Sequence, residues 1–155
     1  MAKILFPLYQ LVLSLWVGGI AIFTFLVTPA VFKSFDRDTA SRVVDSFMGK
    51  YFAWNLVLSV SALILILSLR NMLPGGYKLP LAIATLAVLI TAFTAFGLYP
   101  RIREVKRQIV SFETAPKDSE ARKRFSRLHA VSMVLNVILL ADGAVLLVTS
   151  GCLKK

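Results

Sequence analysis

Four segments of the sequence are nearly free of charge, and each is long enough to cross a lipid bilayer. They cover residues 4–32, 51–69, 79–98 and 128–149. About 20 apolar residues in a helix span a hydrocarbon core of about 30 Å, and backbone groups inside that core must find their hydrogen bonds within the chain. The segments therefore predict an all-α integral membrane protein, in which residues 1–155 form one domain: an antiparallel bundle of four transmembrane helices.

Composition supports this prediction. Hydrophobic residues make up 57% of the chain, above the roughly 45–50% of soluble domains. The first segment follows Lys3 as a signal peptide would, but it is much longer than a typical apolar region of about 7–15 residues, so we expect a retained helix. Cys152 is the one cysteine, which excludes an internal disulfide.

Basic residues are concentrated in two of the loops. Of the 18 Lys and Arg residues, 13 lie in residues 33–50 and 101–127. Cytoplasmic loops of membrane proteins carry such an excess, so both loops are predicted to be cytoplasmic and both termini to lie outside. If the source is prokaryotic, the predicted membrane is the cytoplasmic (inner) membrane. The net charge of +10 then indicates topology and anionic lipid headgroups rather than a nucleic-acid partner.

The first basic loop contains a helical pattern of its own. Asp38 is a suitable N-cap for a helix over residues 39–48, in which apolar residues recur at helical spacing. This pattern predicts a short amphipathic helix that either lies on the cytoplasmic membrane surface or packs on the ends of the bundle.

Small residues predict how two helix pairs approach each other. Ser14 and Gly18 stand four residues apart, a spacing that lets another membrane helix come close. Pro74, Gly75 and Gly76 form a tight turn signal, so the second and third helices are predicted to be antiparallel neighbours.

Polar residues inside the apolar segments identify a candidate ligand site. His129, Ser132 and Asn136 share one face of the fourth helix, in the half predicted to be cytoplasmic. Asn55 and Tyr99 fall at comparable depth on the second and third helices. Polar residues of a membrane bundle normally face its interior, so we predict one polar cluster, which either binds a ligand or ion or only joins helices by hydrogen bonds. Thr24, Thr28 and Thr94 are expected at the same depth.

Asp142 is a separate candidate. It lies beyond the bilayer midpoint and is rotated about 140° from the face of His129. A carboxylate at the centre of a membrane helix costs about 2.5–3.5 kcal/mol. Pairing with Arg70, a position at an oligomer interface, and binding of a proton or cation are all compatible with the sequence.

Enzyme and metal chemistry are not indicated. His129 is the only histidine, whereas zinc sites use three or four ligands, so it is a weak metal candidate and a structural or proton-exchanging role is favoured. The sequence contains no nucleophile–base pair, phosphate-binding loop or dinucleotide fingerprint. We therefore predict no cofactor and no catalysis.

Two sequence patterns carry a resemblance to a known family. One reads G-x-x-x-F-x-x-x-x-x-P-x-x-F-x-x-F from Gly19 to Phe35, and the other reads F-x-x-x-H-x-x-S-x-x-x-N from Phe125 to Asn136. Together they resemble the transmembrane protein 205-like (TMEM205-like) family, and more distantly the copper-resistance D and HemJ-type membrane proteins. The first resemblance implies four membrane helices and, from its animal members, export or trafficking in platinum-drug resistance. The second implies metal or haem held by membrane histidines.

These observations predict a small membrane protein that binds, or helps to export, a small solute or metal complex. Because four helices alone make a thin pore, a homo-oligomer is expected. One alternative is a non-transporting scaffold or accessory subunit, whose basic cytoplasmic hairpin docks a partner. A second alternative is a metal- or haem-binding redox protein.

Overall fold

The fold consists of long helices, two of which contain a π-helical segment. The structure is a computed structural model that describes residues 2–70, 76–116 and 118–152. In chain order its elements are α1 (Ala2–Ile22), the π-helix η1 (Phe23–Val27), α2 (Thr28–Ser34), α3 (Arg37–Leu69), α4 (Lys78–Ala92), the π-helix η3 (Phe93–Leu98), α5 (Tyr99–Arg107) and α6 (Glu120–Cys152).

Four continuous helical rods within the described residues are long and apolar enough to cross a membrane. They run over Ile4–Ser34, Arg37–Leu69, Lys78–Arg107 and Glu120–Ser150. The prediction of an all-helical integral membrane protein with four spanning helices is confirmed at this level. Each rod extends beyond its apolar segment at the end where the basic loops lie.

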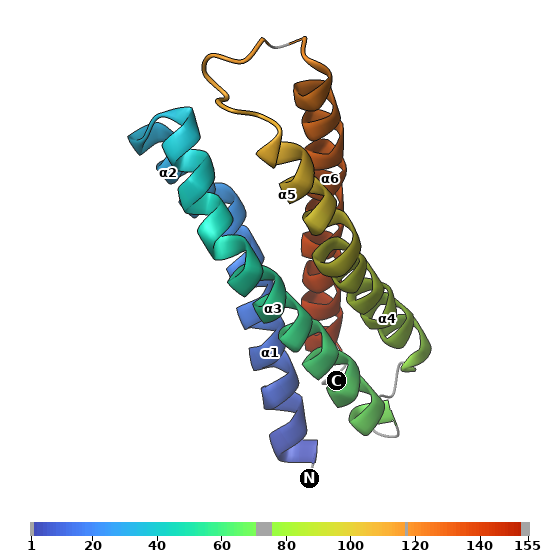
Figure 1. Ribbon diagram of the computed structural model, residues 1–155. Coiled ribbons are helices and arrows are strands. Elements are labelled where there is room, and N and C mark those ends of the chain that lie inside the picture. Colours follow the sequence, from blue (N-terminus) through green and yellow to red (C-terminus); the bar gives the residue numbers. More distant parts are fainter. Residues whose placement is uncertain (1, 71–75, 117, 153–155) are drawn as a thin grey trace.

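The rods run alternately up and down, as Figure 1 shows. The first rod, which begins with α1, contacts α3 and α6, and the third, which begins with α4, contacts the same two helices. Both termini lie at one end of the bundle. At the opposite end, the pair α2–α3 and the pair α5–α6 separate from each other.

The closely packed core lies in the half that holds the termini. Its buried residues are Tyr9, Val12, Leu13, Trp16, Ile20, Leu58, Ala62, Leu65, Ile66, Leu69, Ala84, Ala87, Leu139 and Leu146. At Gly143, α6 packs tightly against α1, because a Cβ atom there would lie 2.8 Å from Cγ2 of Val17.

The amphipathic helix predicted over residues 39–48 is not a separate element. It forms the first part of α3, which runs without interruption into the second apolar segment, since Gly49 alone costs a helix only about 1 kcal/mol. The N-cap is Asp36 instead of Asp38: its Oδ1 accepts a 2.8 Å hydrogen bond from the backbone N–H of Thr39. That bond lowers the pKa of the Asp36 carboxyl.

The small-residue pair of the first helix does not form a helix contact. Ser14 is exposed, and a Cβ atom on Gly18 would meet no atom of a neighbouring element within 4 Å. The turn predicted from Pro74 and Gly75 lies outside the described residues. Gly76, which follows it, has a φ of +88°, a backbone conformation that glycine adopts without steric cost.

Candidate functional site

A cavity of about 520 Å³ lies between the two separating helix pairs. All four rods and the segment after α5 contribute side chains to it. Pockets for small molecules usually enclose about 300–1,000 Å³ and combine apolar walls with a few polar groups. The volume therefore fits a small ligand or part of a larger one.

The two π-helical segments turn polar side chains toward this cavity. Each ends just before an X-Pro step, Thr28-Pro29 in the first rod and Tyr99-Pro100 in the third. A proline removes one N–H and crowds the carbonyl four residues earlier, and a local π turn is one way to accommodate that in a membrane helix. The backbone N–H of Thr28 bonds to the Phe23 carbonyl, and the Thr28 hydroxyl donates to the same oxygen at 2.9 Å.

A hydrogen-bond chain joins three rods across the cavity. The Nδ2 of Asn136 donates to Oγ1 of Thr24 at 2.8 Å, and the Tyr51 hydroxyl donates to Oδ1 of Asn136 at 2.5 Å. The amide of Asn136 is thereby used as both donor and acceptor, which fixes its orientation. This chain links η1, α3 and α6.

Asn55 presents an acceptor that has no partner among the described residues. The side chain is 2% exposed, and its Nδ2 donates to the backbone carbonyl of Tyr51 at 2.9 Å. Because that carbonyl can bond only to a donor, Oδ1 is the atom left over, and it is buried without a hydrogen bond. Asn55 is also one of the residues that line the cavity.

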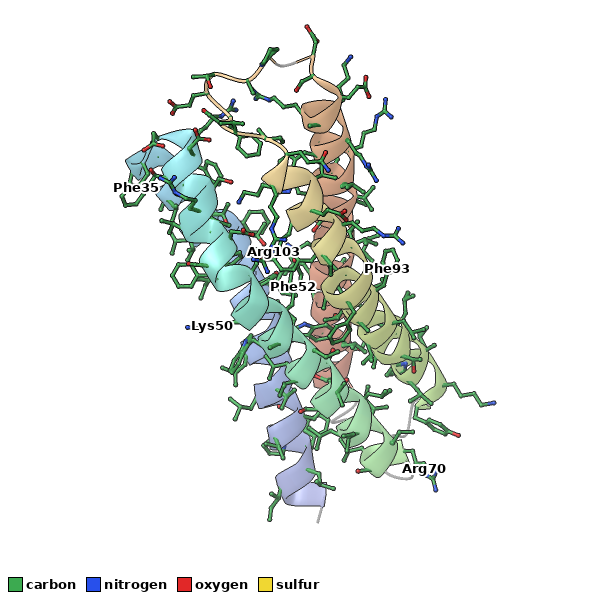
Figure 2. The ribbon with its side chains drawn as sticks, in the orientation of Figure 1. Phe35, Lys50, Phe52, Arg70, Phe93 and Arg103 are labelled. Carbon is green, nitrogen blue, oxygen red and sulfur yellow. The ribbon has the colours of Figure 1, made fainter. Side chains whose placement is uncertain are left out.

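Aromatic side chains form one wall of the cavity. The ring of Phe23 stacks on Tyr51 with centroids 4.5 Å apart. Phe52 contacts Tyr51 at 5.6 Å and Tyr99 at 5.1 Å, and Figure 2 shows Phe52 in the space between α3 and the third rod. Nearer the loops, Phe125 stacks on His129 with centroids 5.6 Å apart. These faces provide an apolar surface beside the polar chain.

Charged groups gather where the cavity approaches the basic loops. The Nζ of Lys106 lies 3.4 Å from Oδ2 of Asp45, and the Tyr99 hydroxyl donates to Oδ1 of Asp45 at 3.0 Å. Arg122 also lines the cavity and donates to two backbone carbonyls of the preceding loop, at 2.9 and 2.7 Å. With Arg37, three cations and one carboxylate line the cavity.

Five of the six residues predicted to bind a ligand lie around this one cavity. They are His129, Ser132, Asn136, Asn55 and Tyr99. The three threonines expected at the same depth, Thr24, Thr28 and Thr94, line it too. His129 is exposed at the edge of the cavity. Within the described part of the chain, no three His, Cys, Asp or Glu side chains gather as metal ligands would.

Asp142 is not part of the cavity. It lies beside Gly143, in the region where α6 contacts α1, and its Oδ2 is buried with no hydrogen-bond partner in the described part of the chain. Pairing with Arg70 is not observed among the described residues, since Arg70 is exposed at the far end of α3. The structure thus separates Asp142 from the other five candidates.

The charged edge of the cavity was not among the predicted site residues. One face of α3 carries a series of cavity residues at helical steps of three and four positions: Asp45, Met48, Tyr51, Phe52 and Asn55. The signal was present, but it crosses the boundary between the predicted loop helix and the second apolar segment. Lys106 and Arg122 belong to a basic loop that the sequence associated with topology, anionic lipid headgroups or a docked partner, and not with a ligand cavity.

The fold and the cavity define a four-helix membrane protein with a polar-lined cavity at one end of its bundle. The chain belongs to a family described as a domain of unknown function (DUF4149), which matches residues 11–111. The match begins within α1 and extends past α5 but does not include α6, so His129, Ser132 and Asn136 lie beyond it. Comparisons with curated proteins and with solved structures gave no match.

Proposed function

We propose that this protein binds a small solute in the cavity between its helix pairs and assists export of that solute. The observation that carries the proposal is the buried Oδ1 of Asn55, an acceptor that no described residue pairs, on a residue that lines a cavity of ligand size. Leaving such an atom unpaired costs about 1–3 kcal/mol, which a hydrogen-bond donor supplied by a ligand would recover.

The proposal includes a membrane orientation. Residues within 33–50 and 101–127 line the cavity, and these two segments carry most of the basic residues. By the positive-inside rule the end where these segments lie faces the cytoplasm and both termini lie outside, in the inner membrane if the source is prokaryotic. The TMEM205-like resemblance, through its export-associated animal members, supports the same direction of transport.

The test uses a cavity-filling substitution and a matched control. Ser132 lines the cavity, whereas Val134 on the same helix is 59% exposed and does not line it. We expect wild type and Val134→Trp to retain a small molecule through purification, detected by mass spectrometry after denaturation, and Ser132→Trp to lose it. The identified compound is then loaded into vesicles containing each protein, where release should follow binding.

Two results would contradict the proposal. If no compound distinguishes wild type from Ser132→Trp, the cavity is not a solute site. If binding distinguishes them but vesicle release does not, the protein binds without assisting export.

A further inference from the structure

The two halves of the chain repeat one pattern. The first rod reads Phe23-Thr24 at the start of η1 and continues to a proline, and the third reads Phe93-Thr94 at the start of η3 and continues to a proline. The helix that follows each rod carries an asparagine that lines the cavity, Asn55 in α3 and Asn136 in α6. The cavity therefore lies between two related helical hairpins and has two corresponding sides: α3 with α5, and α6 with α2.

The side between α3 and α5 is closed by polar contacts. Asp45 accepts from the Tyr99 hydroxyl and pairs with Lys106, and Lys106 also donates to the backbone carbonyl of Ser41 at 3.0 Å. Nearer the loop, Oδ1 of Asp38 accepts from the backbone N–H of Phe112 at 2.7 Å. These bonds tie α3 to α5 and to the segment that follows it.

The corresponding side between α2 and α6 has no such closure. Thr28 directly precedes Pro29 as Tyr99 precedes Pro100, and Ser126 stands ten residues before Asn136 as Asp45 stands before Asn55. The Thr28 hydroxyl bonds within its own helix, and in the described residues no hydrogen bond or ion pair joins α2 to α6.

Residues that line the cavity are open to the outside along this second side. Phe32 of α2 is 45% exposed and Met133 of α6 is 57% exposed, and both line the cavity. Ser126 and His129 of α6 are exposed there as well. Because α2 and α6 belong to rods long and apolar enough to cross a membrane, we expect the opening between them to face the bilayer.

We propose that the ligand is an anionic amphiphile that enters sideways from the bilayer, between α2 and α6. This inference rests on the proposed solute-binding function and names the class of solute. Arg37 and Arg122 line the cavity in addition to the Asp45–Lys106 pair, so the site carries a positive excess that attracts an acidic headgroup. The acyl chain leaves past Phe32 and Met133, which line the cavity on this side.

The experiment measures lipid retained by the full chain in neutral detergent, using native mass spectrometry. The probes are dioleoyl phosphatidylglycerol, dioleoyl phosphatidylcholine and soluble glycerol 3-phosphate. We expect one phosphatidylglycerol per chain, retained at least about tenfold better than phosphatidylcholine because of the two added cations. Arg37→Gln with Arg122→Gln should remove that preference.

Two further variants test the route. Met133→Trp should reduce phosphatidylglycerol retention by about tenfold, whereas Val134→Trp, equally exposed on the next position, should not. Thr28→Tyr with Ser126→Asp copies the closure of the α3–α5 side and should also reduce retention. Thermal unfolding of each variant checks that the fold is kept.

Three outcomes would overturn the inference. The chain could retain phosphatidylglycerol and phosphatidylcholine equally, with no difference between Met133→Trp and Val134→Trp. That result would mean that lipid binds only to the outer surface of the bundle. Binding of glycerol 3-phosphate that Met133→Trp leaves intact would mean entry from water. The chain could instead bind no lipid but retain a soluble compound that Ser132→Trp no longer retains. That result would refute an amphiphilic ligand and leave the proposed solute-binding function intact.

Discussion

Gly143→Ala should destabilise the bundle, and the structure gives the reason atom by atom. The added Cβ would lie 2.8 Å from Cγ2 of Val17 and 3.5 Å from the ring of Trp16, whereas carbon atoms prefer about 3.5–4.0 Å. Val17 is β-branched and has one favoured rotamer in a helix, and Trp16 is fully buried. Neither side chain can swing away, so α6 must move from α1 by several tenths of an ångström. Overpacking of this kind costs about 1–3 kcal/mol.

The measurement is reversible unfolding in mixed micelles with a rising fraction of sodium dodecyl sulfate, followed by tryptophan fluorescence. Gly18→Ala is the matched control, because its Cβ would meet nothing within 4 Å and alanine is the better helix former by about 0.8–1.0 kcal/mol. We expect the two alanines to shift the midpoint in opposite directions. If Gly143→Ala unfolds with wild type or later, the close α1–α6 contact is wrong.

Three further changes have defined outcomes. Asn136→Leu removes the acceptor of the Tyr51 hydroxyl and should lower the free energy of unfolding by about 1–2 kcal/mol; in that background Tyr51→Phe should cost nothing more in the same assay. Asp45→Asn breaks the ion pair with Lys106, a part-exposed pair that contributes about 0.5–1 kcal/mol, and should speed hydrogen exchange of the α5 amides. The pKa of Asp36 is lowered from 3.8 by its capping hydrogen bond, so its contribution to stability is complete above that pH and is lost as the pH falls through the lowered pKa. Asp36→Asn, which still caps the helix, should flatten that part of the stability profile between pH 5 and about 2.

The sequence was enough to predict the spanning helices and the depth of the polar residues along them. An apolar segment of about 20 residues has few alternatives in a bilayer, and depth follows from counting residues along a helix. Counting is enough to bring Asn55, Tyr99 and Asn136 to one level, since each polar group must also turn inward. What counting cannot give is a partner: the bond from Tyr51 to Asn136 joins residues 85 positions apart.

Helix contacts were less accessible to the sequence because they depend on rotation. The pair Ser14 and Gly18 has the spacing of a close contact, yet it faces away from the other helices. Gly143 makes the contact without a second small residue at that spacing. Asp142 likewise suggested Arg70 as a partner, but no ion pair joins the two among the described residues, because Arg70 is exposed. Hydropathy fixes how deep a residue lies and leaves open which way it points.

One end of the bundle is closely packed and the other end holds the cavity, and this difference follows from the positions of Gly143, Pro29 and Pro100. Gly143 and the buried residues around Trp16 hold the rods together near the termini. Toward the other end, Pro29 and Pro100 each follow a π-helical turn, and the helix pairs diverge around the cavity. Membrane helices associate through packing rather than through the hydrophobic effect, so most of the packing stabilisation resides in the closed half. Polar residues can therefore line the open half at little cost to the fold, and substitutions there should change ligand binding more than stability.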